Sequence, residues 1–119
     1  MAVKGIARSL KTRQIDVQII SCSVDGTATT PAATGMDAKF IQSVADNGTG
    51  SYTITILDGQ AAQANLVPIG IVPLTSGRIG RVSAVSKTAI TVTFVNDAGA
   101  AADSDFILTF MHRKYGTNL

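Results

Sequence analysis

A chain of 119 residues has room for one domain, and its net charge of +2 comes from ten Lys and Arg against eight acidic residues. All eight acids are Asp; the lack of Glu, which favours helices, argues against surface helices. A charged fraction of 15%, against about 25% in typical domains, suits a surface partly covered by neighbours. No apolar run reaches the ~18 residues of a transmembrane helix, and the N-terminus resembles no secretory signal.

Residues 1–13 form a basic segment that contains no acid. Its four cations are Lys4, Arg8, Lys11 and Arg13. Val3, Ile6 and Leu10 would share one face of a short helix, but a helix of this length is marginal alone, so we expect an extended arm that orders against a partner. Two interpretations stay open here: a solvated terminus, or a clamp on an acidic protein surface or nucleic acid.

Seven apolar runs with strand character follow the arm. They are Ile15–Val24, Ala38–Ala45, Ser51–Leu57, Leu66–Leu74, Ile79–Val85, Ala89–Val95 and Asp105–Met111. Apolar residues alternate with Thr in several of them, which is typical of half-buried strands. In the first run the apolar parity changes at Ile19 and Ile20, which predicts either a bulge or a strand that passes from one face-pairing to another. Pro68 and Pro73 cannot donate to a ladder, so Leu66–Leu74 is expected to be an edge strand or an extended packing segment.

The connections between these runs are rich in Gly, Asp and Asn. Asn47-Gly48 predicts a hairpin turn, because both residues tolerate positive φ. The last three runs are expected to form a three-stranded antiparallel meander, and Asp25–Asp37 and Asn96–Ser104 to be long loops that carry contacts. The fold class predicted is all-β: a single antiparallel β-sandwich or small barrel of six to seven strands over residues 14–115. Residues 1–13 are the arm and 116–119 a C-terminal tail.

The sequence offers no set of residues that indicates catalysis. Cys22, in an apolar run, is expected to be a buried small hydrophobe, and the single histidine, His112, lies beside two cations. One Cys and one His cannot form a zinc cage, and Asp97, Asp103 and Asp105 lack calcium-loop spacing. We therefore expect no enzyme activity, no metal and no cofactor.

Three segments resemble small virion structural proteins of tailed bacteriophages, of the capsid decoration (cement) type. They are the leader MAVKGIARSLKTRQ, the strand GSYTITILDG (50–59) and the block VSAVSKTAITVTFVNDAGAAADSDFILTF (82–110). The resemblance implies a non-enzymatic β-rich subunit, commonly a homotrimer, that is made in the host cytoplasm and stiffens the outside of the head. It implies the major capsid protein as partner, without membrane or nucleic acid.

Within this resemblance, the arm cations are the candidate capsid contacts. They are Lys4, Arg8, Lys11 and Arg13. The alternative is a tail, baseplate or fibre-tip module whose long loops, Asp25–Asp37 and Asn96–Ser104, bind a host glycan or a tail protein. A nucleic-acid-binding barrel is a third possibility that rests only on the basic arm and the pI, and a steep salt dependence would reveal it.

Overall fold

The computed structural model describes residues 15–57 and 64–115, so the predicted arm and tail lie outside the described residues. Eight strands and one 3-10 helix make up this part of the chain, which contains no α-helix. In chain order the elements are β1 (Ile15–Val24), β2 (Ala33–Thr34), η1 (Met36–Phe40), β3 (Ile41–Gly48), β4 (Ser51–Ile56), β5 (Ala64–Pro73), β6 (Ile79–Val85), β7 (Ala89–Val95) and β8 (Phe106–Tyr115).

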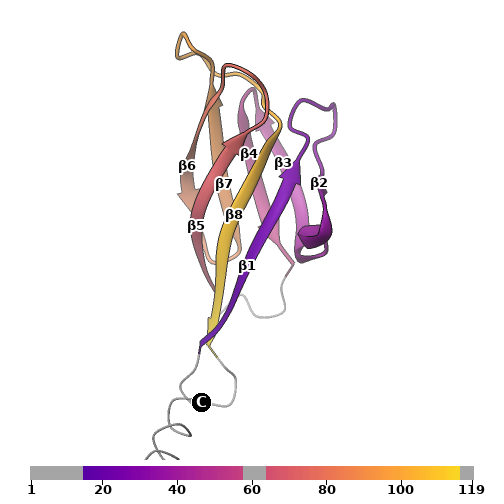
Figure 1. Ribbon diagram of the computed structural model, residues 1–119, viewed down its shortest axis with the longest axis vertical. Helices are drawn as coiled ribbons and strands as arrows, with labels where there is room; N and C mark the ends of the chain where they lie inside the picture. Colours follow the sequence, from indigo (N-terminus) through magenta and orange to yellow (C-terminus); the bar gives the residue numbers. More distant parts are fainter. Residues whose placement is uncertain (1–14, 58–63, 116–119) are drawn as a thin grey trace, which may run out of the picture.

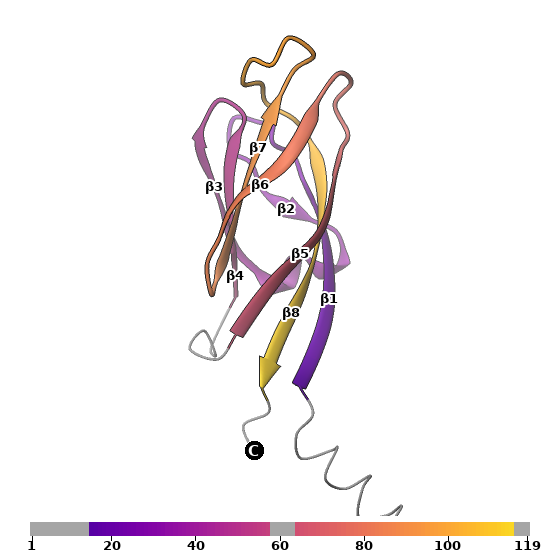
Figure 2. The same cartoon turned by 90° about the vertical axis from the view of Figure 1, so that its left-hand side faces the viewer.

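The strands form two four-stranded sheets that face each other (Figures 1 and 2). Sheet A has the order β2-β1-β8-β5 and sheet B the order β3-β4-β7-β6. Every pairing is antiparallel, and the two sheets share no strand. The all-β prediction is therefore confirmed, and of its two forms the fold is the sandwich. It has eight strands, where six to seven were expected.

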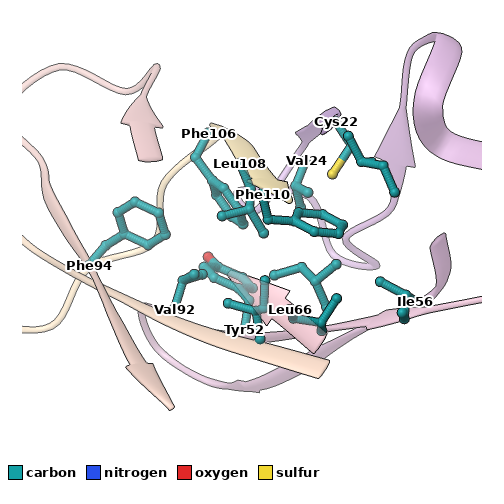
Figure 3. Close-up of a cluster of buried hydrophobic side chains, with 13 residues drawn as sticks. Cys22, Val24, Tyr52, Ile56, Leu66, Val92, Phe94, Phe106, Leu108 and Phe110 are labelled. Atoms are coloured by element: carbon teal, nitrogen blue, oxygen red, sulfur yellow. The ribbon is translucent and has the colours of Figure 1, made fainter. Parts of the chain in front are cut away.

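A single core fills the space between the sheets, and alternate residues of the central strands build it (Figure 3). β4 and β7 are buried at every second position, and the Thr residues between those positions are partly exposed. The core side chains are Ile20, Cys22, Val24, Tyr52, Ile54, Ile56, Leu66, Ile90, Val92, Phe94, Phe106, Leu108 and Phe110. The chain is poor in aromatics, and three of them lie together in this core. The rings of Tyr52, Phe94 and Phe106 have centroids 4.8–6.0 Å apart, in edge-to-face and tilted arrangements.

The predicted three-stranded meander is wrong in its last strand. β6 pairs with β7, but β8 crosses to sheet A and lies between β1 and β5. The alternation in β8 reports correctly that Phe106, Leu108 and Phe110 are buried. It does not say against which sheet they pack, because both inner faces of a sandwich have the same period.

Two features of sheet A test the predictions made from the apolar parity of β1 and from the prolines of β5. β5 is an edge strand with a register shift between Pro68 and Gly70, which confirms its predicted position. The predicted bulge at Ile19 and Ile20 is wrong, since β1 pairs with β8 without interruption from Ile15 to Val24. The parity changes because Ile19 points outward and is 67% exposed.

The segment predicted as the loop Asp25–Asp37 contains more structure than expected. β2 pairs with the upper end of β1, and η1 follows it directly. The strand expected from Ala38 is also wrong at its start, because residues 38–40 belong to η1 and β3 begins at Ile41. Short elements of two to five residues leave too few periods for a sequence pattern to reveal them.

Candidate functional site: the two ends of the sandwich

The predicted contact residues belong to the segment that precedes β1. Lys4, Arg8, Lys11 and Arg13 lie outside the described residues, so their positions are not tested. The structure does place the point where this segment joins the domain. In the register of β1 with β8, Asp16 lies opposite Lys114 and Val17 opposite Arg113.

The first residues of β1 and the last residues of β8 therefore lie side by side at one end of sheet A (Figure 1). β8 carries Arg113 and Lys114 at this end, and in the sequence the basic segment 1–13 closely precedes β1; together these two stretches hold six of the ten Lys and Arg residues. We call this the basic end. The sequence alone does not show that the start of β1 and the end of β8 are neighbours; their antiparallel pairing does.

The opposite end, which we call the loop end, is formed by residues 25–32, 48–50, 74–78 and 96–105 (Figures 1 and 2). Tyr52 lies beneath them; its hydroxyl donates to the Gly26 carbonyl at 2.7 Å and accepts from the Ser104 N–H at 3.4 Å. Arg78 Nε donates to the Asp103 carbonyl at 2.7 Å. Residues 25–32 of the first predicted contact loop thus lie at the same end as the second predicted loop, Asn96–Ser104, and hydrogen bonds run between the loops.

Two of the three Asp residues considered for calcium, Asp103 and Asp105, have hydrogen-bond partners here. Asp105 Oδ1 accepts from the N–H and hydroxyl of Thr27 at 3.0 and 2.7 Å, and Asp103 Oδ1 accepts from the Gly50 N–H at 2.7 Å. Within residues 15–57 and 64–115, no group of three or more His, Cys, Asp or Glu side chains is placed to hold a metal ion. These carboxylates therefore fasten loops together.

Beside the loop end, the outer face of sheet B has a shallow depression of about 380 Å³. Its floor follows the row of cross-strand partners Ser51, Thr93 and Arg81. Arg81 is exposed, and its Nε donates to Thr93 Oγ1 at 3.4 Å. The remaining lining residues are Thr49, Gly50, Ile79, Gly80, Phe94, Val95 and Ala101. Its one aromatic, Phe94, is buried, so the depression offers hydroxyls, one guanidinium and aliphatic carbon.

A second groove of about 350 Å³ runs between β5 and β6 and shares Gly80 and Arg81 with the first. Ile69 and Ile79, each more than half exposed, line one groove or the other. Sequence reasoning missed both hollows. The one sequence feature that points to them is Gly80, a glycine inside a strand. A Cβ there would meet the Phe94 ring at 2.5 Å, so glycine allows β6 to lie close to the core.

Among the described residues, two groups have a clearly raised pKa, so they hold their protons more tightly than usual. Burial, with a smaller contribution from the Asp37 charge, raises the pKa of the Cys22 thiol to about 11. Burial is also the main cause that raises the pKa of Tyr52 to about 12. At neutral pH Cys22 is therefore a thiol within the core, as predicted, and not a thiolate nucleophile.

Comparisons of the chain with protein-family models, with curated proteins and with solved structures give no match. In the described part of the chain, no helix is long and apolar enough to cross a membrane. The functional proposal therefore rests on the fold and on the two ends of the sandwich.

Proposed function

We propose that this protein is a non-enzymatic structural subunit of a bacteriophage virion, a decoration protein that binds the outer surface of the head and stabilises it. Two observations support the proposal: the sequence resemblance to such proteins and an all-β sandwich of suitable size. A third observation, the register of β1 with β8, supports its mechanism. It sets the start of β1, which the basic segment precedes in the sequence, beside Arg113 and Lys114 of β8.

The binding mechanism is electrostatic attraction followed by ordering of the arm. Lys4, Arg8, Lys11 and Arg13 contact acidic groups of the major capsid protein, and Arg113 and Lys114 strengthen the positive field where the arm begins. Each exposed ion pair contributes only about 0.2–1 kcal/mol. Binding is therefore the sum of several contacts per subunit, and a homo-oligomer, a trimer in proteins it resembles, would add avidity.

A tail, baseplate or fibre-tip module remains the second candidate, and the depression at Arg81 is the observation that favours it. Its hydroxyls and guanidinium are groups that bind sugars or carboxylates, and it adjoins the loop end. Stacking on an exposed aromatic would add to such a site. The depression lacks one, because Phe94 is buried beneath it.

The test compares binding of four proteins to heads assembled without this subunit. They are the wild type, a chain lacking residues 1–13, the quadruple variant Lys4→Gln/Arg8→Gln/Lys11→Gln/Arg13→Gln, and Arg81→Gln. Sedimentation of heads with bound protein gives the affinity, and circular dichroism checks the fold. We expect the deletion and the quadruple variant to stay folded and to lose at least tenfold in affinity, about 1.4 kcal/mol.

Arg81→Gln is the control for loss of a positive charge outside the basic end, and it should bind as the wild type does. Unaltered binding by both arm variants would refute the mechanism. Binding of none of the four proteins would count against capsid decoration itself, and the same proteins would then be tested on glycans.

A further inference from the structure

One side of β1 is left without a strand partner over half its length. The upper end is covered, because β2 pairs with Ser23 and Val24. At Ser21 the backbone N–H donates to Asp37 Oδ2 at 2.9 Å, so a carboxylate of η1 stands where a neighbouring strand would be. Within residues 15–57 and 64–115, no strand pairs with this side of β1 from Ile15 to Cys22 (Figure 1).

The hydrogen bonds at the upper end show which residues direct their backbone groups to the open side. The Ser21 N–H bonds to Asp37, and the Ser23 carbonyl accepts from Thr34 Oγ1. Both are odd-numbered residues, and in an antiparallel strand alternate residues face the same side. Ile15, Val17 and Ile19 therefore present N–H and C=O groups to the open edge, while the even-numbered residues bond to β8.

The other sheet edges carry features that oppose pairing with a further strand. β5 has two prolines and a register shift between Pro68 and Gly70. β6 has a shift between Val82 and Ala84, and β3 has two shifts. Bulges and prolines are the devices by which proteins protect their edges. β1 has neither, since its ten partners in β8 follow without interruption.

We propose that the open half of β1 is an interface for a second copy of this chain, whose β1 pairs with it antiparallel across a two-fold axis at Val17. In this register Ile15 lies opposite Ile19 of the other copy, and the pairs 15/19, 17/17 and 19/15 exchange about six backbone hydrogen bonds. Sheet A then continues through both copies. An edge of this kind fits itself, because a two-fold axis presents the same odd-numbered groups from both sides.

Charge and the Asp37 contact select this register over its neighbours. An axis at Asp16 would place two Asp residues directly opposite each other, which is destabilising. An axis at Gln18 would extend the pairing to Ser21, whose N–H is already bonded to Asp37. The axis at Val17 sets Asp16 opposite Gln18 and ends at Ile19. It also places the 67% exposed side chain of Ile19 beside an Ile of the other copy.

This inference does not depend on the proposed function. It concerns contact between copies in solution, whether or not they bind a head. It also differs from the trimer implied by the family resemblance, because a two-fold pairing closes with two copies. Five paired residues make a small interface, of the size class below about 1,200 Å² that characterises weak association.

The first test is the solution mass of the full chain and of Val17→Pro, by sedimentation equilibrium up to about 1 mM, a range suited to weak association. Proline removes the N–H that faces the open side and none that bonds to β8, so the domain should fold. Val17→Thr keeps the N–H and is the matched control. We expect wild type and Val17→Thr to dimerise as concentration rises, and Val17→Pro to weaken dimerisation at least tenfold.

The second test is independent of whether the proline variant folds. Val17→Cys should form an intermolecular disulfide under mild oxidation, because residues paired on the axis lie about 5.5 Å apart, within disulfide range. Gln18→Cys lies off the axis, faces Asp16 of the other copy and should cross-link much more slowly. Cys22 is buried in both variants.

Four results would overturn the proposal. They are a wild type that stays monomeric throughout, a trimer, a folded Val17→Pro that dimerises as the wild type does, or faster cross-linking of Gln18→Cys than of Val17→Cys. If deleting residues 1–14 abolishes association and Val17→Cys does not cross-link, the arm of a neighbouring copy fills the edge instead of β1.

Discussion

Tyr52 is the residue at which the core and the loop end meet. Its ring is buried between the sheets and its centroid lies 5.5 Å from that of Phe106. Its hydroxyl reaches Gly26 and Ser104, which lie in two different loops and are both buried. Tyrosine at this position contributes apolar area to the core and also forms hydrogen bonds to backbone groups that water does not reach. Phenylalanine could contribute only the apolar area.

Removal of that hydroxyl should destabilise the fold without creating a large cavity. We expect Tyr52→Phe to lower the free energy of unfolding by about 1–3 kcal/mol at pH 7, because the Gly26 carbonyl loses its buried partner. Urea unfolding followed by circular dichroism measures it. Tyr115→Phe, which alters the only other tyrosine in the chain, is the control for loss of a phenolic hydroxyl. A change below about 0.5 kcal/mol, the level typical of surface substitutions, would contradict this role.

The same residue predicts a loss of stability in alkali. Its pKa is raised to about 12 in the folded protein from an ordinary value of 10.0, so the unfolded chain loses the proton first. The stabilisation is complete below pH 10 and disappears as the pH rises towards 12, at most about 3 kcal/mol. Cys22 acts in the same direction from a lower starting pKa, so wild type and Tyr52→Phe must be compared across pH 8–12. Equal slopes for the two proteins would contradict the assignment to Tyr52.

At the scale of elements, the sequence pattern predicted seven of the eight strands and the hairpin pairs β3–β4 and β6–β7, but not the partners of β8. The pattern of β4 and β7, apolar at every second position with Thr between, identifies both strands and their buried faces. Pairing is decided by contacts between residues far apart in sequence. β8 joins β1 and β5 because residues 96–105 cross from one sheet to the other, and nothing in their composition encodes that crossing.

The candidate site was less predictable than the fold for the same reason. The sequence identified the basic arm and both long loops, but a depression such as that at Arg81 needs Ser51, Thr93 and Arg81 to become neighbours across three strands. The sequence also did not predict the open edge of β1. It exists because β2 is only two residues long, a length below what periodicity detects.

The β3–β4 turn offers a prediction with an internal control. Gly50 and Gly99 both have positive φ, 72° and 82°, so alanine is strained at either position, by about 1–2 kcal/mol. At Gly50 a Cβ would also meet the Phe94 carbonyl at 2.6 Å and the Ala102 N–H nitrogen at 2.9 Å; at Gly99 nothing lies within 4 Å. Overpacking adds about 1–3 kcal/mol. Gly50→Ala should therefore cost about 2 kcal/mol more than Gly99→Ala in thermal or urea unfolding.

Equal costs for these two variants would show that the β3–β4 turn and residues 96–105 separate easily. The loop end would then be less rigid than its hydrogen bonds indicate. The Gly50 N–H and carbonyl bond to Asp103 and Phe94, so the turn is fastened on both sides. Rigidity at this end is what would allow it to present a fixed surface.

At the scale of the whole molecule, the sandwich separates two kinds of surface along its long axis. At the basic end the start of β1 lies beside the end of β8, and at the opposite end lie the four connections of the loop end (Figures 1 and 2). The depression at Arg81 adjoins the loop end. The two candidate functions use opposite ends. Single variants of equal charge can therefore separate them.

Lys114→Gln and Arg81→Gln each remove one positive charge, one at the basic end and one in the depression. If the basic end binds an acidic capsid surface, Lys114→Gln should weaken binding to heads about twofold to fivefold, the effect of an exposed ion pair, and the loss should shrink at high salt as charges are screened. Arg81→Gln should leave head binding unchanged. The reverse order, measured by sedimentation at two salt concentrations, would favour the depression and with it the tail or fibre-tip function, because position and not net charge would then decide binding.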